Sequence, residues 1–507
     1  MDFINSINIA AIAPLLQADI LLMLFGATSL GLLIGAIPGL TVVLALSLLF
    51  GIAAVVPLEY SLATLLGVYV GGIYGGSITA ILLNIPGTGS SVATLMDGHP
   101  LALRGKAMFA IRVTRAASVI GTAVGACMLL FLTPLLTRAA LHFTSPEFFG
   151  MALLGILLCG GVSSGGDALK GWICGLLGLF LAFVGMDITE GSQRFVFGIP
   201  DLLSGISLVP VVIGLFAVPE VLNYYAHPFA EASKAQKIPS ARLSDFGVLK
   251  EIRNKFRLIA QSALIGVGLG VLPGVGEDIA AWTAYGAAKK TSKHPEEFGK
   301  GSVEGVIAPE VANNSAIGGA FVPLLSLGIP GSPGAAIFLG ALLLYGMRPG
   351  PMLILEKPNL LPQMFATLLL ADVCLLISAT LFIKPIIGIL RISGKYLMPC
   401  ILAVAGIAAY ATDLSRFNFA VMLVAGGIGY LLRLMKYPPS PIILGLILGK
   451  MLDDKFRTTL VIGDGSFMPF IARPVSCVLL LLVSGIILWP IIARFRKNRK
   501  IRDGYAA

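Results

Sequence analysis

Two stretches of small polar residues, each interrupting an apolar run, carry the residue types that could bind an anion. NIPGTGSS begins at Asn84, and GIPGSPGA begins at Gly328. Proline starts or stops a helix, glycine permits close approach, and Ser and Thr donate hydrogen bonds. A helix that begins after such a break offers free amides and a positive dipole to an anion. We interpret both stretches as parts of one anion site, against the alternative that they are helix kinks or packing contacts.

Acidic and amide residues lie beside breaks of the same kind. Glu277 and Asp278 follow the sequence PGVG, and carboxylates near exposed carbonyls suit a sodium ion or a proton. If that tip reaches bulk water, however, the two residues are merely solvated. Asn84, Asn313 and Asn314 could direct amides at a carboxylate or carbonyls at a cation, or could join helices as polar residues do in membranes. The residue types therefore favour an anion with a coupling cation and leave each asparagine open.

The remaining polar residues give weaker signals. Asp97 and His99 could form a protonatable pair or an interfacial turn, because Arg104 follows so closely. Asp167, Asp187, Asp372 and Asp413 are lone carboxylates near predicted helix ends, for which we favour structural roles. The six cysteines are single and are predicted to be small apolar residues. The sequence has no HExxH, GxSxG or Walker motif, so nothing predicts an enzyme, a catalytic residue, a resident metal or a cofactor.

The elements that position these groups must lie in a membrane. Hydrophobic residues make up 57% of the 507 residues and charged residues only 12%, against about 25% in soluble domains. Runs such as 21–38, 118–135 and 475–492 approach the roughly 20 apolar residues that span a bilayer. Backbone groups freed at that depth are tolerated only inside protein or around a water-filled cavity. The composition predicts an all-α polytopic membrane protein with Pro/Gly-broken helices.

Basic residues are unevenly distributed along the chain. No Lys or Arg precedes Arg104, whereas residues 224–257 carry seven basic residues against three acidic, and residues 494–502 carry six basic residues. Loops rich in Lys and Arg stay in the cytoplasm. We therefore predict a cytoplasmic central loop and C-terminus, with the N-terminus on the opposite side. The net charge of +10 follows from this distribution and does not indicate a nucleic-acid partner.

The Pro-Gly breaks fall into two series at nearly constant spacing. Pro38 matches Pro273 (273 − 38 = 235), Pro86 matches Pro330 (330 − 86 = 244), and Pro210 matches Pro441 (441 − 210 = 231). Three matches in the same order predict a duplication. A first half that begins outside and ends in the basic loop has an odd number of crossings, so its copy is inverted. Inverted repeats are common in secondary transporters, whose substrate site lies where the repeats meet.

The repeats give a predicted organisation of the chain. Residues 258–288 lie between basic residues and are too short for two spans of about 20 residues each, so they predict a re-entrant hairpin with PGVGED at its tip. The predicted parts are a first transmembrane repeat (1–223), a basic cytoplasmic linker (224–257), a second transmembrane repeat (258–455), and a final helix with a basic tail (456–507).

Four long motifs resemble the large membrane subunit of the tripartite tricarboxylate transporters, the TctA family. They are IGAIPGLT, YGGSITAILLNIPGTGSSVATLMDGHPLA, GVLPGVGEDIAAW and NNSAIGGAFVPLLSLGIPGSPGAAIFLGALLLYGMRPGP, and the resemblance covers roughly residues 15–455. It implies a bacterial inner-membrane carrier of about 12 helices. It also implies two partners, a small four-helix membrane subunit and a periplasmic solute-binding protein. Members of the family take up citrate or other carboxylates with an ion gradient, usually of sodium. An elevator motion would suit the broken hairpins.

The resemblance also implies positions for the site. The family's substrate contacts fall on Asn84, Pro86, Gly87, Thr88, Gly89, Ser90 and Ser91 in the first half, and on Asn314, Ser315, Pro330, Gly331, Ser332 and Gly334 in the second. For the coupling ion, sodium or a proton, we favour the other two breaks and one asparagine: Pro38, Gly39, Thr41, Pro273, Gly274, Glu277, Asp278 and Asn313.

The leading hypothesis is import of citrate, other tricarboxylates or related carboxylates by cation symport, with the carboxylate delivered by a binding protein. The alternatives are a gated anion channel, which conducts without accumulating its substrate, and a membrane subunit that binds carboxylate without moving it. The sequence does not distinguish citrate from other acids, because Ser, Thr and backbone donors serve all of them.

Overall fold

The computed structural model describes residues 9–37, 40–53, 56–163, 167–187, 191–226, 245–383, 385–386, 394–411 and 414–488. These residues are helical almost throughout, with one two-stranded ribbon, which agrees with the predicted all-α architecture. Pro38, Gly39, Asp413, most of the basic linker and the basic tail lie outside the described residues. The described chain forms two compact units, one within Met1–Leu141 and Ser207–Pro439, the other within His142–Ile206 and Ser440–Ala507.

Unit 1 contains both series of broken helices. Its elements from the first half are α1 (Ile9–Ile12), η2 (Ala13–Leu16), α2 (Ala18–Gly35), α3 (Val42–Ala53), α4 (Leu58–Leu83), α5 (Ser91–Leu101), η3 (Ala102–Lys106), α6 (Ala107–Ala140) and α9 (Leu208–Ala226). Its remaining elements are α10 (Asp245–Asn254), α11 (Phe256–Gly270), α12 (Gly276–Thr291), η5 (Pro295–Glu297), α13 (Val303–Leu327), α14 (Pro333–Leu344), α15 (Pro351–Glu356), α16 (Leu360–Leu381), α18 (Gly394–Ala411) and α19 (Arg416–Leu434).

Six helical stretches in the described part of the chain are long and apolar enough to cross a bilayer. They are Ala18–Gly35, Leu58–Leu83, Ser91–Ala140, Leu208–Ala226, Leu360–Leu381 and Arg416–Leu434. Shorter apolar helices accompany them, among them Phe256–Gly270 and Pro333–Leu344, which flank the breaks. Each predicted break in the described residues separates two helices, as expected where proline and glycine interrupt the backbone ladder. The chain is therefore a polytopic membrane protein.

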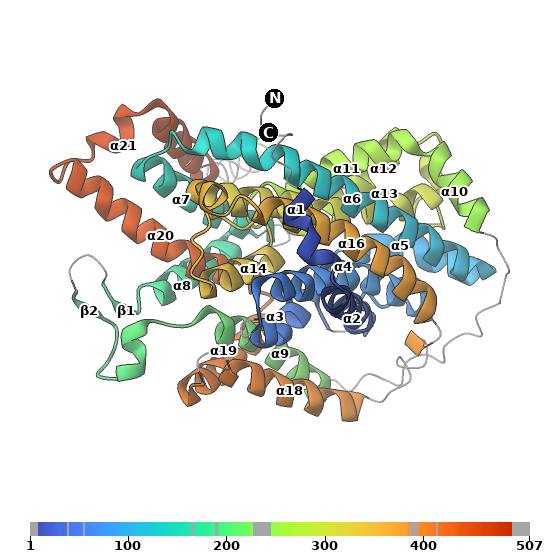
Figure 1. The fold of residues 1–507 in the computed structure, drawn as a ribbon, viewed down its shortest axis with the longest axis horizontal. Helices are drawn as coiled ribbons and strands as arrows, with labels where there is room; N and C mark the ends of the chain where they lie inside the picture. The colour runs from blue at the N-terminus through green and yellow to red at the C-terminus, as the bar shows by residue number, and fades with distance from the viewer. Residues whose placement is uncertain are drawn as a thin grey trace, which may run out of the picture. The chain divides into compact units, whose positions relative to one another are not determined.

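Small residues bring the helices of unit 1 into backbone contact, as in other membrane helix pairs. In Figure 1, α2 lies beside α4, and a side chain at Gly35 would strike the Gly72 backbone. A side chain at Gly270 of α11 would likewise strike the Ala316 backbone of α13. The contacting residues are related by 270 − 35 = 235 and 316 − 72 = 244, the spacings that relate the Pro-Gly breaks. Similar close contacts therefore recur in the two halves at the spacings that relate the breaks.

Gly71 provides a test of this close packing. A side chain at this position of α4 would overlap the Thr28 carbonyl of α2. We expect Gly71→Leu to lower the free energy of unfolding by about 3 kcal/mol, because overpacking forces the backbones apart. Gly268→Leu is the matched control, since Gly268 has open space around it. Unfolding of the purified protein in mixed detergent micelles measures both, and equal stability of the two variants would contradict the expected tight contact.

Unit 2 is a smaller bundle. It comprises α7 (Ser145–Ser163), α8 (Ala168–Ala182), β1 (Gly185–Met186), β2 (Gln193–Arg194), η4 (Pro200–Ser204), α20 (Ser440–Ile462), α21 (Met468–Ala472) and a final apolar helix, Pro474–Leu488. The two strands pair antiparallel, with Gly185 opposite Arg194. The boundaries predicted from the sequence at residues 223, 257 and 455 separate the two predicted repeats, the linker and the tail. Each compact unit, in contrast, contains segments from both halves of the chain.

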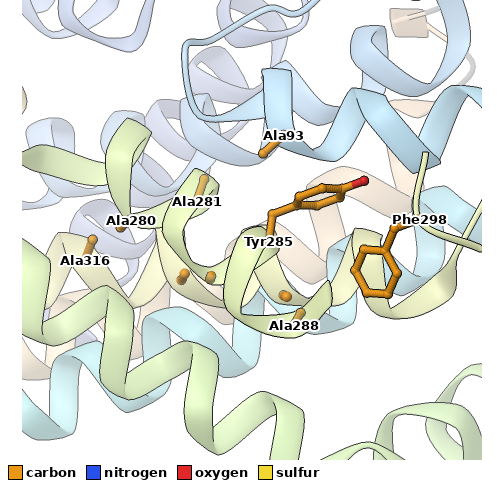
Figure 2. Packing of buried hydrophobic residues seen from close by; sticks show 10 residues of the cluster. Ala93, Ala280, Ala281, Tyr285, Ala288, Phe298 and Ala316 are labelled. Atoms are coloured by element: carbon orange, nitrogen blue, oxygen red, sulfur yellow. The ribbon is translucent and has the colours of Figure 1, made fainter. Parts of the chain in front are cut away.

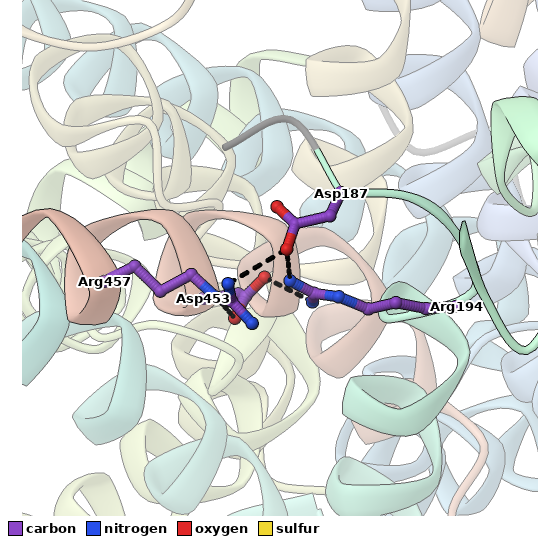
Figure 3. A network of polar contacts seen from close by, with 4 residues as sticks. All are labelled: Asp187, Arg194, Asp453 and Arg457. Carbon is purple, nitrogen blue, oxygen red and sulfur yellow. Dashed lines mark hydrogen bonds and ion pairs between the residues drawn. The ribbon is translucent and has the colours of Figure 1, made fainter. Parts of the chain in front are cut away.

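A network of ion pairs joins the β ribbon of unit 2 to α20 (Figure 3). Arg194 bonds Asp187 and reaches the Asp453 carboxylate at 2.8 Å, while Arg457 reaches Asp187 at 2.9 Å and Asp453 at 3.1 Å. Partial burial disfavours the charge on Arg194, but the hydrogen bonds and charges of Asp453 and Asp187 outweigh this effect and raise its pKa. Asp187 therefore has the structural role that its isolated position in the sequence favoured.

The third sequence match, Pro210 with Pro441, relates α9 of unit 1 to α20 of unit 2, and each of these helices packs against a partner helix. Gly214 of α9 packs against Met422 of α19, and both helices lie in unit 1. Gly445 of α20 packs against Gly175 of α8, and both lie in unit 2. The glycines differ by 445 − 214 = 231 and their partners by 422 − 175 = 247. In each unit, a helix from one half of the sequence therefore pairs with a helix from the other half.

Candidate functional site

The two stretches that we predict to bind an anion form similar turns in unit 1. Helix α4 ends at Asn84 with φ 58°, and α13 ends at Gly328 with φ 74°, both in the left-handed conformation that terminates helices. The next helices begin at Ser91 and at Pro333. Asn84 is exposed and caps α4, at the position where glycine caps α13. We call residues 84–90 and 328–332 the first tip and the second tip.

Hydroxyl groups and glycines hold both tips in shape. The Thr88 hydroxyl accepts the Ser91 amide at 3.3 Å, and the Ser332 hydroxyl accepts the Ala335 amide at 3.1 Å. Gly87 donates its amide to the Gly76 carbonyl at 3.3 Å, as Gly331 does to that of Ala320 at 3.2 Å. A side chain at Gly87 or Gly331 would strike the carbonyl of Gly35 or Gly270, respectively. Both tips are thus anchored to the helices that flank the other two breaks.

The third break, 271–275, brings an acidic pair between the two tips. Gly276 donates its amide to the Gly331 carbonyl at 3.2 Å, and Glu277 and Asp278 follow in the first turn of α12. The Asp278 carboxylate lies against Gly89 and accepts the Ser90 amide of the first tip. The tips and the acidic pair, predicted as substrate and ion regions from separate parts of the sequence, therefore adjoin one another. Pro273 and Gly274 form the turn itself, Gly274 with φ 72°.

Glu277 lies beside the second tip. The Tyr69 hydroxyl donates to Glu277 Oε1 at 2.9 Å and lies 2.7 Å from the Ser332 hydroxyl. Glu277 is 8% exposed, and its second oxygen has no hydrogen-bond partner. Asp278 is exposed by its accessible surface, but many protein atoms lie around its carboxylate. Gly334 packs against the Tyr69 ring. Two adjacent acids thus face two helix N-termini, whose positive dipoles favour the charged carboxylates.

Packing of α12 against α5 fixes the acidic pair relative to the first tip. Figure 2 shows Ala280 and Ala281 of α12 and Ala93 of α5 in one buried cluster with Tyr285 and Phe298. Alanine permits close approach of the two helices, since it adds only a methyl group at the contact. This buried contact therefore holds Asp278 close to the first tip.

The other predicted site residues lie apart from the tips. Ser315 donates to the Ala263 carbonyl of α11 at 3.1 Å, and Asn314 donates to the Asn313 side chain at 2.6 Å. The Thr122 hydroxyl of α6 contacts Asn314 at 3.4 Å. These bonds join α13 to α6 and α11. They agree with the interpretation that the asparagines join helices. The side-chain nitrogen of Asn313 is buried without a partner.

Among the remaining predicted positions, Thr41 caps α3 by accepting the Leu44 amide at 3.2 Å. Pro86, Ser90, Ser91 and Pro330 belong to the tips or to their flanks. Pro38 and Gly39 lie outside the described residues. In the described part of the chain, no three His, Cys, Asp or Glu residues gather as a metal cluster.

Asp97 and His99 do not form a pair. Asp97 accepts the backbone amides of Gly301 at 2.8 Å and Ser302 at 2.7 Å, together with that of Gly299 at 2.9 Å and the Tyr285 hydroxyl at 2.9 Å. His99 Nδ1 lies 3.0 Å from the Ile81 carbonyl. Asp97 thus ties α5 to the start of α13.

Sequence reasoning missed two buried polar residues, Tyr69 and Glu310. The Glu310 carboxylate on α13 accepts hydroxyls from Ser77, Thr94 and Ser118, which lie on α4, α5 and α6. One signal was available, because Glu310 is the only charged residue between positions 305 and 347. For Tyr69, inside a glycine-rich apolar helix, the sequence offers no comparable signal.

The family model of the tripartite tricarboxylate transporter TctA family matches residues 21–444. The chain belongs to the TctA family. An Agrobacterium vitis protein described as the uncharacterized 52.8 kDa protein in the TAR-I ttuC' 3' region is 34% identical over 499 residues, which cover 98% of each chain. A second Agrobacterium vitis protein, from the TAR-II ttuC' 3' region, is 35% identical over 231 residues, 46% of this chain and 96% of its own. No solved structure matches the chain.

Membership of the TctA family confirms the resemblance drawn from the four motifs, and the matched region contains all four breaks. The family is one of transporters, not of enzymes, and its members are parts of tripartite systems. The TctA-family chain is therefore a multi-pass membrane component of a transport system. Its family supplies the general function, and the tips with their acidic pair supply the candidate chemistry.

Proposed function

We propose that this chain is the large permease subunit of a binding-protein-dependent secondary transporter that imports citrate, other tricarboxylates or related carboxylates by symport with sodium. One observation carries the proposal. The two tips, separated by 330 − 86 = 244 residues between their prolines, both adjoin the acidic pair Glu277 and Asp278. The N-termini of α5 and α14 supply amides and dipoles for a carboxylate. The pair supplies negative charge for a cation.

Sodium binds in this arrangement at the acidic pair. Two neighbouring carboxylates repel each other, and a bound cation relieves that repulsion. Oxygen ligands are at hand in the unpartnered Glu277 oxygen, the Tyr69 and Ser332 hydroxyls and the accessible Asp278 carboxylate. Hard cations prefer oxygen ligands of this kind. Sodium at this position also offsets the charge of an incoming carboxylate, which couples the two binding events.

The repeated contacts support an inverted pair of repeats, within a total of about 12 spans that includes shorter and broken helices. Equivalent glycines, caps and turns recur at spacings of 235 and 244 residues. The basic linker and tail support a cytoplasmic central loop and C-terminus, because loops rich in Lys and Arg stay in the cytoplasm. The proposed location is the bacterial inner membrane. The proposed partners are a small four-helix membrane subunit and a periplasmic solute-binding protein, as in other tripartite systems.

Uptake into proteoliposomes tests the proposal. The chain is reconstituted with its small membrane subunit, and labelled citrate is supplied with the binding protein, with and without an inward sodium gradient. Accumulation above equilibrium that needs both the gradient and the binding protein is the expected result. Conduction without accumulation would favour the gated anion channel, and binding without uptake would favour a non-transporting subunit. Other tricarboxylates and dicarboxylates, added as competitors, define the substrate class.

Ser332 at the second tip provides a residue-level test. We expect Ser332→Ala to lower the citrate uptake rate about tenfold, because hydrogen bonds to charged groups contribute about 1.5 to 3 kcal/mol. Ser302→Ala is the matched control, since Ser302 caps α13 through its own hydroxyl at a distance from both tips. Initial rates are normalised to the amount of folded protein. Equal rates for the two variants would count against the second tip as part of the substrate site.

A further inference from the structure

Glu310 is a buried carboxylate with an unusual set of partners. It lies on α13 and is 0% exposed. The hydroxyls of Ser77 and Thr94 donate to its Oε1 atom at 2.5 Å each, and that of Ser118 donates to Oε2 at 2.9 Å. The three donors come from α4, α5 and α6 and are 192 or more residues from Glu310 in sequence. Four helices therefore meet at this one side chain.

Glu310 forms no ion pair with any Lys, Arg or His in the described part of the chain. On α6, Arg115 donates to the Thr380 hydroxyl at 2.6 Å. On α4, Tyr74 donates to the Ile111 carbonyl at 3.2 Å. On α5, Asp97 is engaged by the amides described above. A charge buried without an ion-pair partner is costly, and in membrane proteins such residues usually have a function.

One further acid faces the same helix. Asp372 on α16 is 4% exposed, lies beside Thr122 of α6, and has no hydrogen-bond partner on either oxygen. Ser118 and Thr122 occupy neighbouring turns of α6, so this helix has a buried acid on each side. Glu310 differs from Asp372 in that hydroxyls from three helices donate to it.

The distances indicate which ligand fits Glu310. All three hydroxyl oxygens lie 2.5 to 2.9 Å from the carboxylate, which is the range of direct O–H···O hydrogen bonds. At these separations each hydroxyl contacts the carboxylate directly. A proton adds no volume to this arrangement and removes the charge of the carboxylate. The hydroxyl rotors can turn to serve either state, since each hydroxyl both donates and accepts.

We propose that Glu310 is a proton-binding site, distinct from the acidic pair, through which this transporter carries a proton together with its carboxylate. The proposal rests on the transport function proposed above. A proton from one aqueous side joins the carboxylate to give the neutral acid, and leaves on the other side.

Proton binding at Glu310 also changes how the helices are held together. The charged carboxylate accepts hydroxyls from α4, α5 and α6 at once, whereas the neutral acid must donate one hydrogen bond of its own. Hydrogen bonds to a charged group are about twice as strong as neutral ones. Helices α4 and α5 flank the first tip, and α13 leads to the second tip. Protonation therefore loosens the link between the helices that hold the two tips.

Two measurements test the proton site, each with Glu310→Gln and with Glu304→Gln as the matched control. Glu304 is on the same helix but pairs with Lys255 at 2.5 Å near the helix start. An inward gradient of one pH unit multiplies the accumulation ratio about tenfold per symported proton, since 1.36 kcal/mol is a factor of ten. We expect this gain in citrate accumulation in the wild type and in Glu304→Gln, and its loss in Glu310→Gln.

The second measurement does not depend on transport. Infrared difference spectra of the reconstituted protein between acid and alkaline pH detect the carbonyl band of a buried protonated carboxyl. We expect a titrating band in the wild type and in Glu304→Gln that is missing in Glu310→Gln. A band and a pH-gradient response that both persist in Glu310→Gln would overturn the proposal, as would a loss confined to the sodium response. A wild type that accumulates no carboxylate under any gradient would instead remove the transport function, together with the proposal that rests on it.

Discussion

Purified Asp97→Ala protein should unfold with a free energy at least about 3 kcal/mol below that of the wild type, because several hydrogen bonds to a buried charge are lost together. Asp97 is 0% exposed and holds the amides of Gly299, Gly301 and Ser302, which lie just before α13. Its loss leaves those donors and the Tyr285 hydroxyl without their acceptor. Unfolding in mixed detergent micelles measures the difference.

Asp167→Ala is the matched control for Asp97, since Asp167 is an exposed aspartate that precedes α8 without a side-chain cap. We expect its free energy of unfolding to change by less than about 0.5 kcal/mol, as for other surface substitutions. A small effect at both positions would show that the amides before α13 find other acceptors. Asp97→Asn separates charge from shape, because the amide oxygen keeps some of the bonds and loses the charge.

The second large effect is expected at Glu277. Glu277→Gln should raise the sodium concentration for half-maximal citrate uptake about 100-fold, since loss of a buried charge that binds an ion costs roughly 3 kcal/mol. The substitution keeps the volume of the side chain and an acceptor for the Tyr69 hydroxyl, so the second tip retains its shape. Initial uptake rates over a range of sodium concentrations, at constant ionic strength, measure the shift.

Glu296→Gln is the control for Glu277, because Glu296 has a side chain that is 66% exposed in the short helix η5. Its sodium dependence should equal that of the wild type. An unchanged sodium requirement in Glu277→Gln would remove the acidic pair from the proposed cation site. A pH response in that variant is expected to persist, because Glu310 lies in a separate set of contacts.

The sequence predicted the helical membrane architecture and the positions of the breaks from local signals. The Ile-Pro-Gly sequences predicted helix ends, and α4 and α13 end there, capped by Asn84 and Gly328, whereas single prolines such as Pro134 and Pro323 lie inside helices. The sequence assigned the tips and the acidic pair to separate substrate and ion regions, and their nearness is a finding of the structure. The proposed roles of these residues in transport remain predictions.

The rest of the candidate site depends on contacts between distant segments, which one sequence does not specify. Glu310 meets its hydroxyl partners across 192 to 233 residues, and Tyr69 meets Glu277 across 208. Serine and threonine in a membrane helix bond their own backbone as readily as a distant acid. The same limit explains Asp97, whose partners are backbone amides that carry no residue-specific signal. Asn314 and Ser315 lie on the buried side of α13 for a related reason, since their bonds hold α6 and α11.

Helix α8, from the first half of the chain, packs against α20, from the second half, and this has a consequence for biogenesis. Ser440, where α20 begins, follows the last residue of α8 by 440 − 182 = 258 residues. At about 5 to 20 residues per second, a ribosome needs roughly 13 to 50 s to supply that partner. Helix α8 therefore enters the bilayer long before its partner helix, α20, is synthesised. Its glycine face must meanwhile rest against lipid or an insertion factor, so completion of this unit is expected to be a late event in assembly.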